Sequence, residues 1–222
     1  MRNMLYYTFY NKHPRKMGFS SIDEGIDSVL KESFVKEEVL EILRYNKDHI
    51  HFVAQKNEYP YTCPLQIGCD YNTNQIMAAY GLFDETHSPE FREGVKYFED
   101  KKTDIFLINL NKSEKDFSPS TMYEDYAISP TLFHWQSQSQ DRPESSKIQR
   151  YIHHKVTGNI ISLFVREFKK IAANSQYTAP FTFLGNADYM SHQGSQPVSF
   201  VWKLHQPMPA DLLPKANKTI AM

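Results

Sequence analysis

The sequence predicts an α+β fold, in which a helical N-terminal segment is followed by a strongly curved mixed β-sheet or open barrel. Apolar residues recur at helical spacing in the first part of the chain and at alternating positions in much of the rest. Glycine residues punctuate the expected turns of the second part. We therefore expect a helical segment over residues 1–58, a mixed α+β domain over residues 59–213 and a flexible tail over residues 214–222.

Two helices are expected in the N-terminal segment. Ser21 and Glu24 have the spacing of a capping box, and Ile22 begins an apolar stripe of helical period. A second helix is expected from about Phe34 to Tyr45. Its inward side chains would be Val35, Val39, Ile42 and Leu43. The two helices would form a hairpin, whose usual role is structural support.

Strands dominate the expected structure of the second part. The run from Ile105 to Ile108 is continuously apolar, which favours a strand that is buried on both faces. A short helix is expected from Thr73 to Tyr80, and Gly81 stands in the position that ends it. Three further strands would close the domain, over residues 160–168, 181–184 and 198–204.

The stretch from Thr121 to Gln138 is the centre of the functional prediction, because it combines four aromatic rings, two acids and two amides in eighteen residues. Flat rings beside a carboxylate and neutral amides can stack on a nucleobase and recognise its hydrogen-bonding edge. The candidate base-binding residues are Tyr123, Asp125, Trp135, Gln136 and Gln138. Aromatic side chains on strands also commonly belong to the core, and that interpretation stays open for Phe133 and Trp135.

A short helix is expected over residues 147–155, directly after this stretch. Lys147, Arg150 and His154 fall on one of its faces and would form a compact cationic stripe. We predict that these three residues bind DNA phosphates. A solvated helix face is the alternative explanation of the same pattern.

Composition and motifs exclude several classes of function. The formal net charge of −1 provides no global field for a polyanion, so contact with DNA requires a local basic patch. Cys63 and Cys69 lack the spacing of a structural zinc site, and no P-loop or dinucleotide-binding motif occurs. We therefore expect no metal, no cofactor and no catalytic activity in this chain alone. No apolar run approaches membrane-spanning length, so we expect a cytoplasmic protein without membrane contact.

One enzymatic alternative remains from the residues. Glu167 and Lys169, with Asp104, Asp116 or Asp125 upstream, have the outline of a metal-dependent nuclease. In such a site, carboxylates hold the metal and the lysine contacts the attacked phosphate. Nothing in the sequence places the upstream acid beside Glu167, so this alternative ranks below DNA binding.

Several ordered strings resemble a known family. They include Gln-Ile-Met-Ala-Ala-Tyr-Gly81, Thr-Met-Tyr-Glu-Asp-Tyr-Ala-Ile-Ser129, Leu-Phe-His-Trp-Gln-Ser-Gln138 and Tyr-Met-Ser-His-Gln-Gly194. Together they are similar to the C-terminal domain of unknown function that ends many bacterial DEAD/DEAH (superfamily-two) helicases. The resemblance extends from about residue 1 to about residue 213. It departs from the family at Gln196, where we expect an arginine, and at Ile148, where a glycine is common.

The resemblance implies a function and a set of partners. In the longer relatives this domain follows a phospholipase-D-like nuclease and a helicase motor. Some are type IV, modification-dependent restriction enzymes, whose terminal domain recognises methylated or hydroxymethylated cytosine through an SRA-like or PUA-like fold that flips the base. This chain would be the DNA-binding part, with a helicase or nuclease subunit as partner. The alternative is a structural module that docks the motor to the nuclease through the exposed aromatic residues of 5–10 and never contacts DNA.

Overall fold

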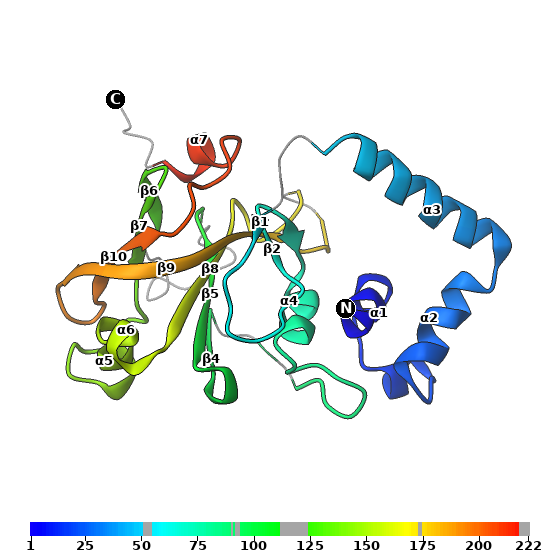
Figure 1. Cartoon of the computed structure of the whole chain (residues 1–222), viewed down its shortest axis with the longest axis horizontal. Coiled ribbons are helices and arrows are strands. Elements are labelled where there is room, and N and C mark those ends of the chain that lie inside the picture. Colours follow the sequence, from blue (N-terminus) through cyan, green and yellow to red (C-terminus); the bar gives the residue numbers. More distant parts are fainter. Residues whose placement is uncertain (51–54, 90, 92–93, 112–123, 173–174, 218–222) are drawn as a thin grey trace.

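The structure is a computed structural model of residues 1–222, and it describes all of them except 51–54, 90, 92–93, 112–123, 173–174 and 218–222. Figure 1 shows the N-terminal helices at one end of the molecule and a mixed sheet at the other. The prediction of an α+β fold with N-terminal helices is confirmed.

The N-terminal part contains helices α1 (Arg2–Phe9), η1 (Pro14–Met17), α2 (Ile22–Leu30) and α3 (Ser33–Asp48). The predicted start of α2 is confirmed, because the Ser21 hydroxyl accepts the backbone N–H of Glu24 at 3.1 Å. The Glu24 carboxylate accepts hydrogen bonds from the backbone N–H and the hydroxyl of Ser20. In a standard capping box it would accept from the residue after Ser20, which is the N-cap residue itself. Both interactions satisfy donors at the helix start.

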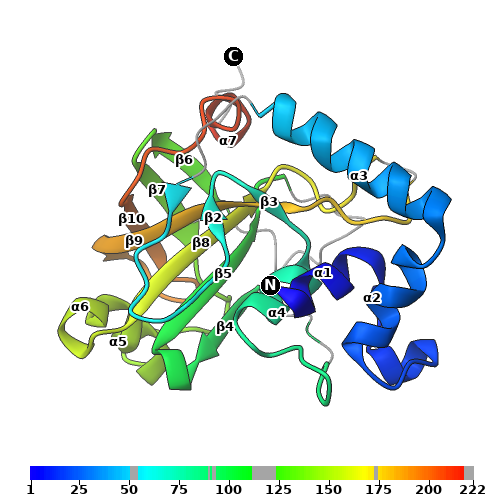
Figure 2. The same cartoon turned by 45° about the vertical axis from the view of Figure 1, so that its right-hand side comes forward.

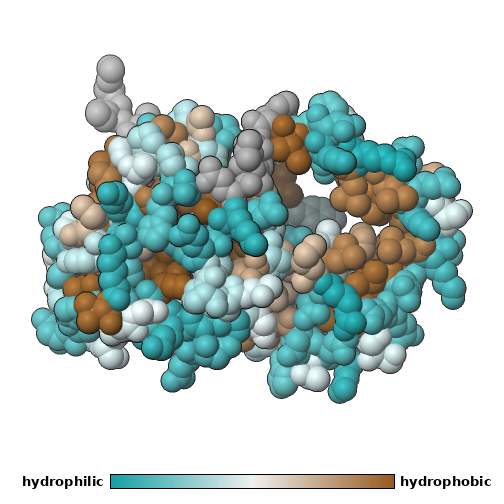
Figure 3. Space-filling view, in the orientation of Figure 1, coloured by the Kyte–Doolittle hydropathy of each residue, from teal (hydrophilic) through white to brown (hydrophobic). Residues whose placement is uncertain are grey.

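Helix α3 differs from the prediction in its packing. None of its residues is buried, and Ile42 and Leu43 are 56% and 58% exposed. Figure 3 shows apolar side chains gathered along this helix, on the side that faces α1 and α2. The predicted burial of Val35, Val39, Ile42 and Leu43 is therefore wrong: Val39 is half-buried and the other three are exposed. The sequence has the period of an amphipathic helix, but the fold leaves its apolar face without a covering layer.

The main sheet has eight strands, and β5 and β8 form its parallel pair. The path runs β4-β5-β8-β9-β10-β7-β6, with β3 paired to β9. In the described part of the chain β4 and β6 are separate edges, so the sheet is open (Figure 2). The strand bounds are β3 Asp70–Tyr71, β4 Val95–Phe98, β5 Thr103–Asn109, β6 Tyr126–Ser129, β7 Leu132–Gln136, β8 Ile160–Arg166, β9 Phe181–Gln193 and β10 Ser199–Leu204.

Shorter elements complete the fold. They are β1 (Gln55–Lys56) and β2 (Gln66–Ile67), which pair with each other, and helices α4 (Thr73–Ala79), η2 (Glu99–Lys101), α5 (Ser146–Ile152), α6 (His154–Thr157) and α7 (Leu213–Ala216). Helix α4 begins where the sequence predicts, with Asn72 and Gln75 forming a capping box.

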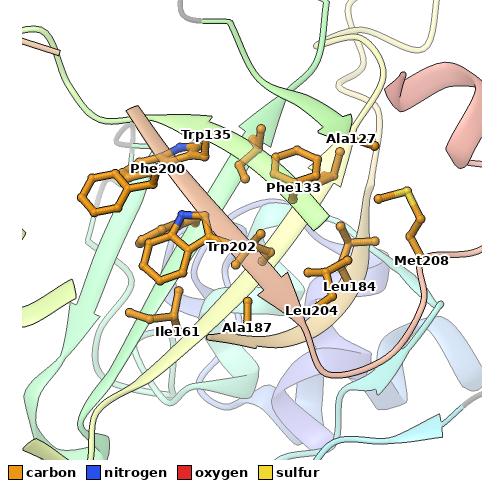
Figure 4. Packing of buried hydrophobic residues seen from close by; sticks show 14 of the residues in the cluster. Ala127, Phe133, Trp135, Ile161, Leu184, Ala187, Phe200, Trp202, Leu204 and Met208 are labelled. Atoms are coloured by element: carbon orange, nitrogen blue, oxygen red, sulfur yellow. The ribbon is translucent and has the colours of Figure 1, made fainter. Parts of the chain in front are cut away.

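The sheet is strongly curved, as a contact between β5 and β7 shows. Phe106 stacks on Trp135 with 4.2 Å between ring centroids, although three strands separate β5 from β7 in the sheet. Four steps across a flat sheet would separate these strands by about 19 Å. The concave side encloses the first core, in which Phe133, Phe200 and Trp202 are fully buried (Figure 4).

A second core lies on the opposite side of the sheet and includes the first two helices. Tyr6 and Tyr7 of α1 pack with α4 and with the strand residues Ile105 and Phe164. Within β5, Ile105 and Leu107 belong to this core while Phe106 and Ile108 belong to the first. The prediction that this strand is buried on both faces is confirmed.

Strand β9 is much longer than predicted, because Gly185 does not end it. This glycine has a φ of +87°, and a side chain there would approach the Cδ1 atom of Ile67 to 2.7 Å. A residue without Cβ therefore lets β2 cross close to β9. The strand then continues to Gln193, and its second half pairs with β10.

Candidate nucleic-acid interface

The register of three strands places polar side chains in a row on the convex side of the sheet. Ser199 of β10 lies opposite Gln136 of β7 on one side and Gln193 of β9 on the other. The Gln136 Nε2 atom donates to the Ser199 Oγ atom at 3.2 Å, and its Oε1 atom accepts the Glu124 backbone N–H at 2.9 Å. Gln193 is exposed, while Gln136 and Ser199 are half-buried.

An aromatic pair lies beside this row. Tyr126 of β6 and His134 of β7 face each other in the sheet, and their rings stack with 4.6 Å between centroids. His134 is two residues before Gln136, so its side chain points to the same side of the sheet. The His134 Nδ1 atom lies 2.8 Å from the Glu124 carbonyl oxygen, which fixes the ring. We call these five residues, Tyr126, His134, Gln136, Gln193 and Ser199, the polar sheet face.

Trp135 points to the opposite side of the same strand. It is 6% exposed and packs in the first core against Phe200 (Figure 4). Its ring also stacks on Phe106. Asp125 is 7% exposed, and its Oδ1 atom accepts the backbone N–H of Gln136 at 2.9 Å. The strand thus separates Trp135 from Gln136, and their predicted shared role at one base stays a prediction. Tyr123 lies outside the described residues.

Gln138 and Lys147 meet at the rim of the sheet. The Lys147 ammonium donates to the Gln138 Oε1 atom at 2.8 Å and lies 2.7 Å from the Oδ1 atom of Asp141. The other oxygen of Asp141 accepts the backbone N–H of Gln138 at 3.1 Å. The Lys147 side chain is 27% exposed, so its ammonium group contacts both the Asp141 carboxylate and solvent.

Arg150 is held more firmly. Its Nε and NH2 atoms each donate to Asp104 at 2.8 Å, and its guanidinium carbon lies 3.9 Å above the ring of Tyr97. Hydrogen bonding to the Asp104 carboxylate raises the pKa of Arg150. The predicted stripe therefore contains two cations, Lys147 and Arg150, that already have carboxylate partners within the chain.

His154, the third residue of the stripe, is 3% exposed and bonds the backbone on both sides of its ring. Its Nε2 atom accepts the Tyr189 N–H at 3.0 Å, so the ring proton is on Nδ1, which donates to the Asn159 carbonyl oxygen at 3.2 Å. Burial lowers the pKa of His154 and favours the neutral ring. Lys147 and Arg150 both act on Asp104, whereas the charged groups around His154 are Asp188, Lys155 and His205. Whether the three predicted residues contact phosphate stays a prediction.

The acids of the nuclease alternative have other partners in the part of the chain that the structure describes. Asp104 is paired with Arg150, Glu167 lies 3.8 Å from the Lys215 ammonium, and Asp116 lies outside the described residues. Among the described residues, no group of three or more His, Cys, Asp and Glu side chains is placed to hold a metal ion. The same part of the chain has no helix long and apolar enough to cross a membrane.

Sequence reasoning missed Gln193 and Ser199 as members of the polar sheet face. Gln193 belongs to the string Tyr-Met-Ser-His-Gln-Gly194, which carried part of the family resemblance, and Ser199 precedes an alternating apolar strand. The alternation predicts which side each residue takes. It does not predict that β10 lies between β7 and β9, and this pairing is what joins the three polar side chains.

No curated protein sequence matches the chain. Among solved structures, the crystal structure of Arabidopsis thaliana SUVH6 in complex with SAM is similar over 94% of this chain and 40% of that chain, with 11% sequence identity and a TM-score of 0.39. The family model of a domain of unknown function, DUF3427, matches residues 65–215, which include the polar sheet face and leave out α1 to α3. The chain therefore belongs to the DUF3427 family.

Proposed function

We propose that the chain binds DNA and recognises a modified cytosine, as the terminal domain of a helicase-type restriction or DNA-defence system. The observation that carries this proposal is the polar sheet face, where an aromatic stack lies beside three hydrogen-bonding side chains. The family match supports it, because residues 65–215 contain the strings on which the resemblance to helicase-associated domains rests.

The chemistry of this face suits a base that has left the double helix. Glutamine amides offer both a donor and an acceptor, which is what the edge of a base requires. A flat ring beside them can stack on an unpaired base, and such stacking contributes about 1–3 kcal/mol per base. Tyr126 supplies the ring, and Gln136 and Gln193 supply the amides. Modified and unmodified cytosine would then be distinguished by contacts at the edge of the base.

Electrostatics predict modest affinity for phosphate. Lys147, Arg150 and Lys155 each lie within 2.8 Å of a carboxylate oxygen, so their charges are largely compensated within the chain. Lys203 is exposed, and it lies four residues after Ser199, on the side of β10 that carries the polar sheet face. We expect a shallow dependence of binding on salt, because few counterions are released. Specificity would then come mainly from the base.

Gln193→Ala is the sharpest test, since no hydrogen bond from the Gln193 side chain stabilises the described structure. Binding of duplexes with cytosine, 5-methylcytosine or 5-hydroxymethylcytosine should be measured across a salt series. We expect the variant to lose about 1–3 kcal/mol of affinity for the preferred duplex. Gln176→Ala is the matched control, because Gln176 is also exposed and lies outside the polar sheet face. Equal binding by both variants, or no binding of DNA by the wild-type chain, would contradict the proposal.

A protein-docking module is the second candidate, and the exposed face of α3 favours it. Tyr6 and Tyr7, two of the aromatic residues expected to contact the motor, are buried in the second core and cannot form a docking surface. Helix α3 instead presents Ile42 and Leu43 to solvent, and it lies outside the family match. An amphipathic helix can place such a face in an apolar groove of a partner. The partner we propose is the helicase motor of the longer relatives.

The two candidates are separated by one pair of variants. Ile42→Ser with Leu43→Ser should abolish association with a helicase motor and leave DNA binding unchanged, if α3 docks. Gln193→Ala should have the opposite pattern. Association of the motor with the α3 variant as strong as with the wild-type chain would exclude docking through α3.

A further inference from the structure

A pocket of about 170 Å³ is lined by residues of α1, η1 and α4, by residues 11–13 between α1 and η1, and by Phe83, Ser88, Pro89 and Phe91. Its polar lining includes Tyr7, Lys12, His13, Lys16, Thr73 and Ser88. A water molecule occupies about 30 Å³ in the liquid, so the space is large enough for a tetrahedral oxyanion. Part of the lining, including Tyr7, Lys12, His13 and Lys16, precedes residue 65 and so lies outside the family match. None of the lining residues belongs to the polar sheet face.

His13 contributes a buried donor without a partner. Its side chain is 7% exposed, and its Nδ1 atom accepts the backbone N–H of Arg15 at 3.3 Å. Since Nδ1 is the acceptor, the proton of the neutral ring is on Nε2. The Nε2 atom is buried and has no hydrogen-bond partner among the described residues. An unsatisfied buried donor destabilises a protein by about 1–3 kcal/mol, so an acceptor that reached this atom would stabilise the fold.

Tyr7 contributes a second donor of the same kind. Its side chain is 2% exposed, and Ser88 lies near its hydroxyl without completing a hydrogen bond of normal geometry. Burial raises the pKa of Tyr7, so the phenol keeps its proton and remains a donor. Two unsatisfied donors thus line one pocket, on α1 and just before η1.

The charge of the pocket selects an anion. Lys12 and Lys16 line it, and neither forms an ion pair with a described carboxylate. The described lining contains no Asp or Glu. The nearby Asp84 carboxylate accepts hydrogen bonds from Thr86 and His87, which hold it outside the lining. An anion in the pocket would therefore meet two ammonium groups and two buried donors. The Asp84 charge, which also raises the pKa of Tyr7, would oppose it.

We infer that this pocket binds a phosphate group, carried either by a free mononucleotide or by the 5′ end of a DNA strand. A phosphomonoester has three terminal oxygens and about two negative charges, which matches donors that approach from several elements. A carboxylate would leave part of this donor set unused. The Tyr7 hydroxyl and the His13 Nε2–H would contact the inner oxygens, with Lys12 and Lys16 at the outer ones.

Calorimetric titration with inorganic phosphate tests the inference on the full chain. We expect saturable binding that weakens about tenfold or more in Tyr7→Phe and in His13→Asn, since each removes a hydrogen bond to a charged group. Asparagine retains an acceptor for the Arg15 N–H, so His13→Asn keeps the start of η1. Tyr7→Phe should leave the melting temperature unchanged or raise it, because the lost hydroxyl has no partner in the free protein.

Controls and ligand variants complete the test. Tyr45→Phe and Lys47→Gln on α3 should bind phosphate as the wild type does. No saturable heat up to about 10 mM phosphate, or equal binding by all variants, would overturn the inference. Tighter binding of deoxycytidine monophosphate would identify a free nucleotide, and tighter binding of a 5′-phosphorylated than a 5′-hydroxyl oligonucleotide would identify a DNA end. Because Gln193→Ala leaves this pocket intact, failure here and failure of the proposed function are distinguishable.

Discussion

Arg150 and Asp104 form a bidentate ion pair that ties α5 to β5. Both hydrogen bonds are 2.8 Å long, and the Asp104 side chain is only 1% exposed. Burial raises the pKa of Asp104, while the guanidinium opposes that shift and keeps the carboxylate charged. The pair thus depends on both members, because either charge alone would be left poorly solvated.

Arg150→Met should destabilise the protein by about 3–5 kcal/mol, because it leaves the Asp104 carboxylate buried without its partner. Urea unfolding monitored by circular dichroism measures the loss. The double variant Arg150→Met with Asp104→Leu should recover much of it, since replacing a whole buried pair by apolar residues is often close to neutral. A loss below about 1 kcal/mol in the single variant would mean that the pair is solvated as surface pairs are.

Trp135 and Tyr126 are expected to respond oppositely to truncation. Trp135→Ala should cost about 3–5 kcal/mol of stability, because the ring is buried against Phe106 and Phe200. Tyr126→Ala should cost less stability, because this ring is only half-buried, but it should weaken DNA binding by about 1–3 kcal/mol if the ring stacks on a base. Thermal melting and DNA titration of both variants provide the comparison. Weaker DNA binding by a fully folded Trp135→Ala, with Tyr126→Ala unaffected, would restore the original assignment of Trp135.

Much of the fold follows from local patterns. Ser21 fixes the start of α2, and the apolar run around Phe106 indicates a strand between two layers, because both signals lie within a few residues of the feature they predict. The length of β9 could not be predicted in this way. Gly185 has the appearance of a turn residue, but its role depends on the approach of Ile67 from a distant strand.

The candidate site was predictable only in part, for the same reason. Alternation along one strand separates Trp135 from Gln136, and the sequence identifies both as unusual. The partners of Lys147 and Arg150 come from Asp141 and Asp104, of which the second is 46 residues away, so helical spacing alone suggested free cations. Burial of α3 was inferred from the helical spacing of its apolar residues. That spacing predicts which side of the helix is apolar, but not whether another layer of the protein covers it.

His154 should make stability fall as the pH drops below about 6.5. Its pKa is lowered in the folded state by burial, whereas the unfolded chain has the ordinary value near 6.5. The unfolded state therefore binds the proton more readily, and stability is complete above that value and falls as the pH drops below it. Asp188, Lys155 and His205 act on the same ring.

Comparing the pH dependence of stability in His154→Gln and in the wild type tests this prediction. Glutamine can keep a backbone hydrogen bond but cannot titrate, so the fall in melting temperature from pH 7.5 to pH 5.5 should be smaller than in the wild type. His192→Gln is the control, because His192 is exposed. Equal slopes for wild type and His154→Gln would show that the ring is protonated in the folded protein as easily as in the unfolded chain.

Helix α3 should tolerate polar substitution that α2 cannot. Ile42→Ser removes a side chain that is 56% exposed, so we expect a change within about 0.5 kcal/mol in the free energy of unfolding. Ile26→Ser buries a hydroxyl at a position that is 7% exposed and should cost about 2–5 kcal/mol. Chemical unfolding of the two variants gives both values. A large cost at Ile42 would show that a layer covers α3 in solution.

Asp125→Asn is the most discriminating variant at the edge of the site. The Asp125 Oδ1 atom accepts the Gln136 N–H at 2.9 Å, and asparagine offers an oxygen in the same place. Loss of the charge should therefore cost only about 1 kcal/mol of stability. If Asp125 also accepts the exocyclic amine of a flipped cytosine, the amide nitrogen of asparagine opposes that contact, and the preference for modified over unmodified DNA should shrink.

Interpreting Asp125→Asn requires two measurements, one of folding and one of the preference for modified DNA. The variant should be examined by circular dichroism and melting before its binding to duplexes with and without 5-methylcytosine is compared. A folded variant that discriminates as the wild type does would show that Asp125 does not contact the base. An unfolded variant would show that the carboxylate, 7% exposed beside Gln136, is needed first to hold the start of β6 against the end of β7.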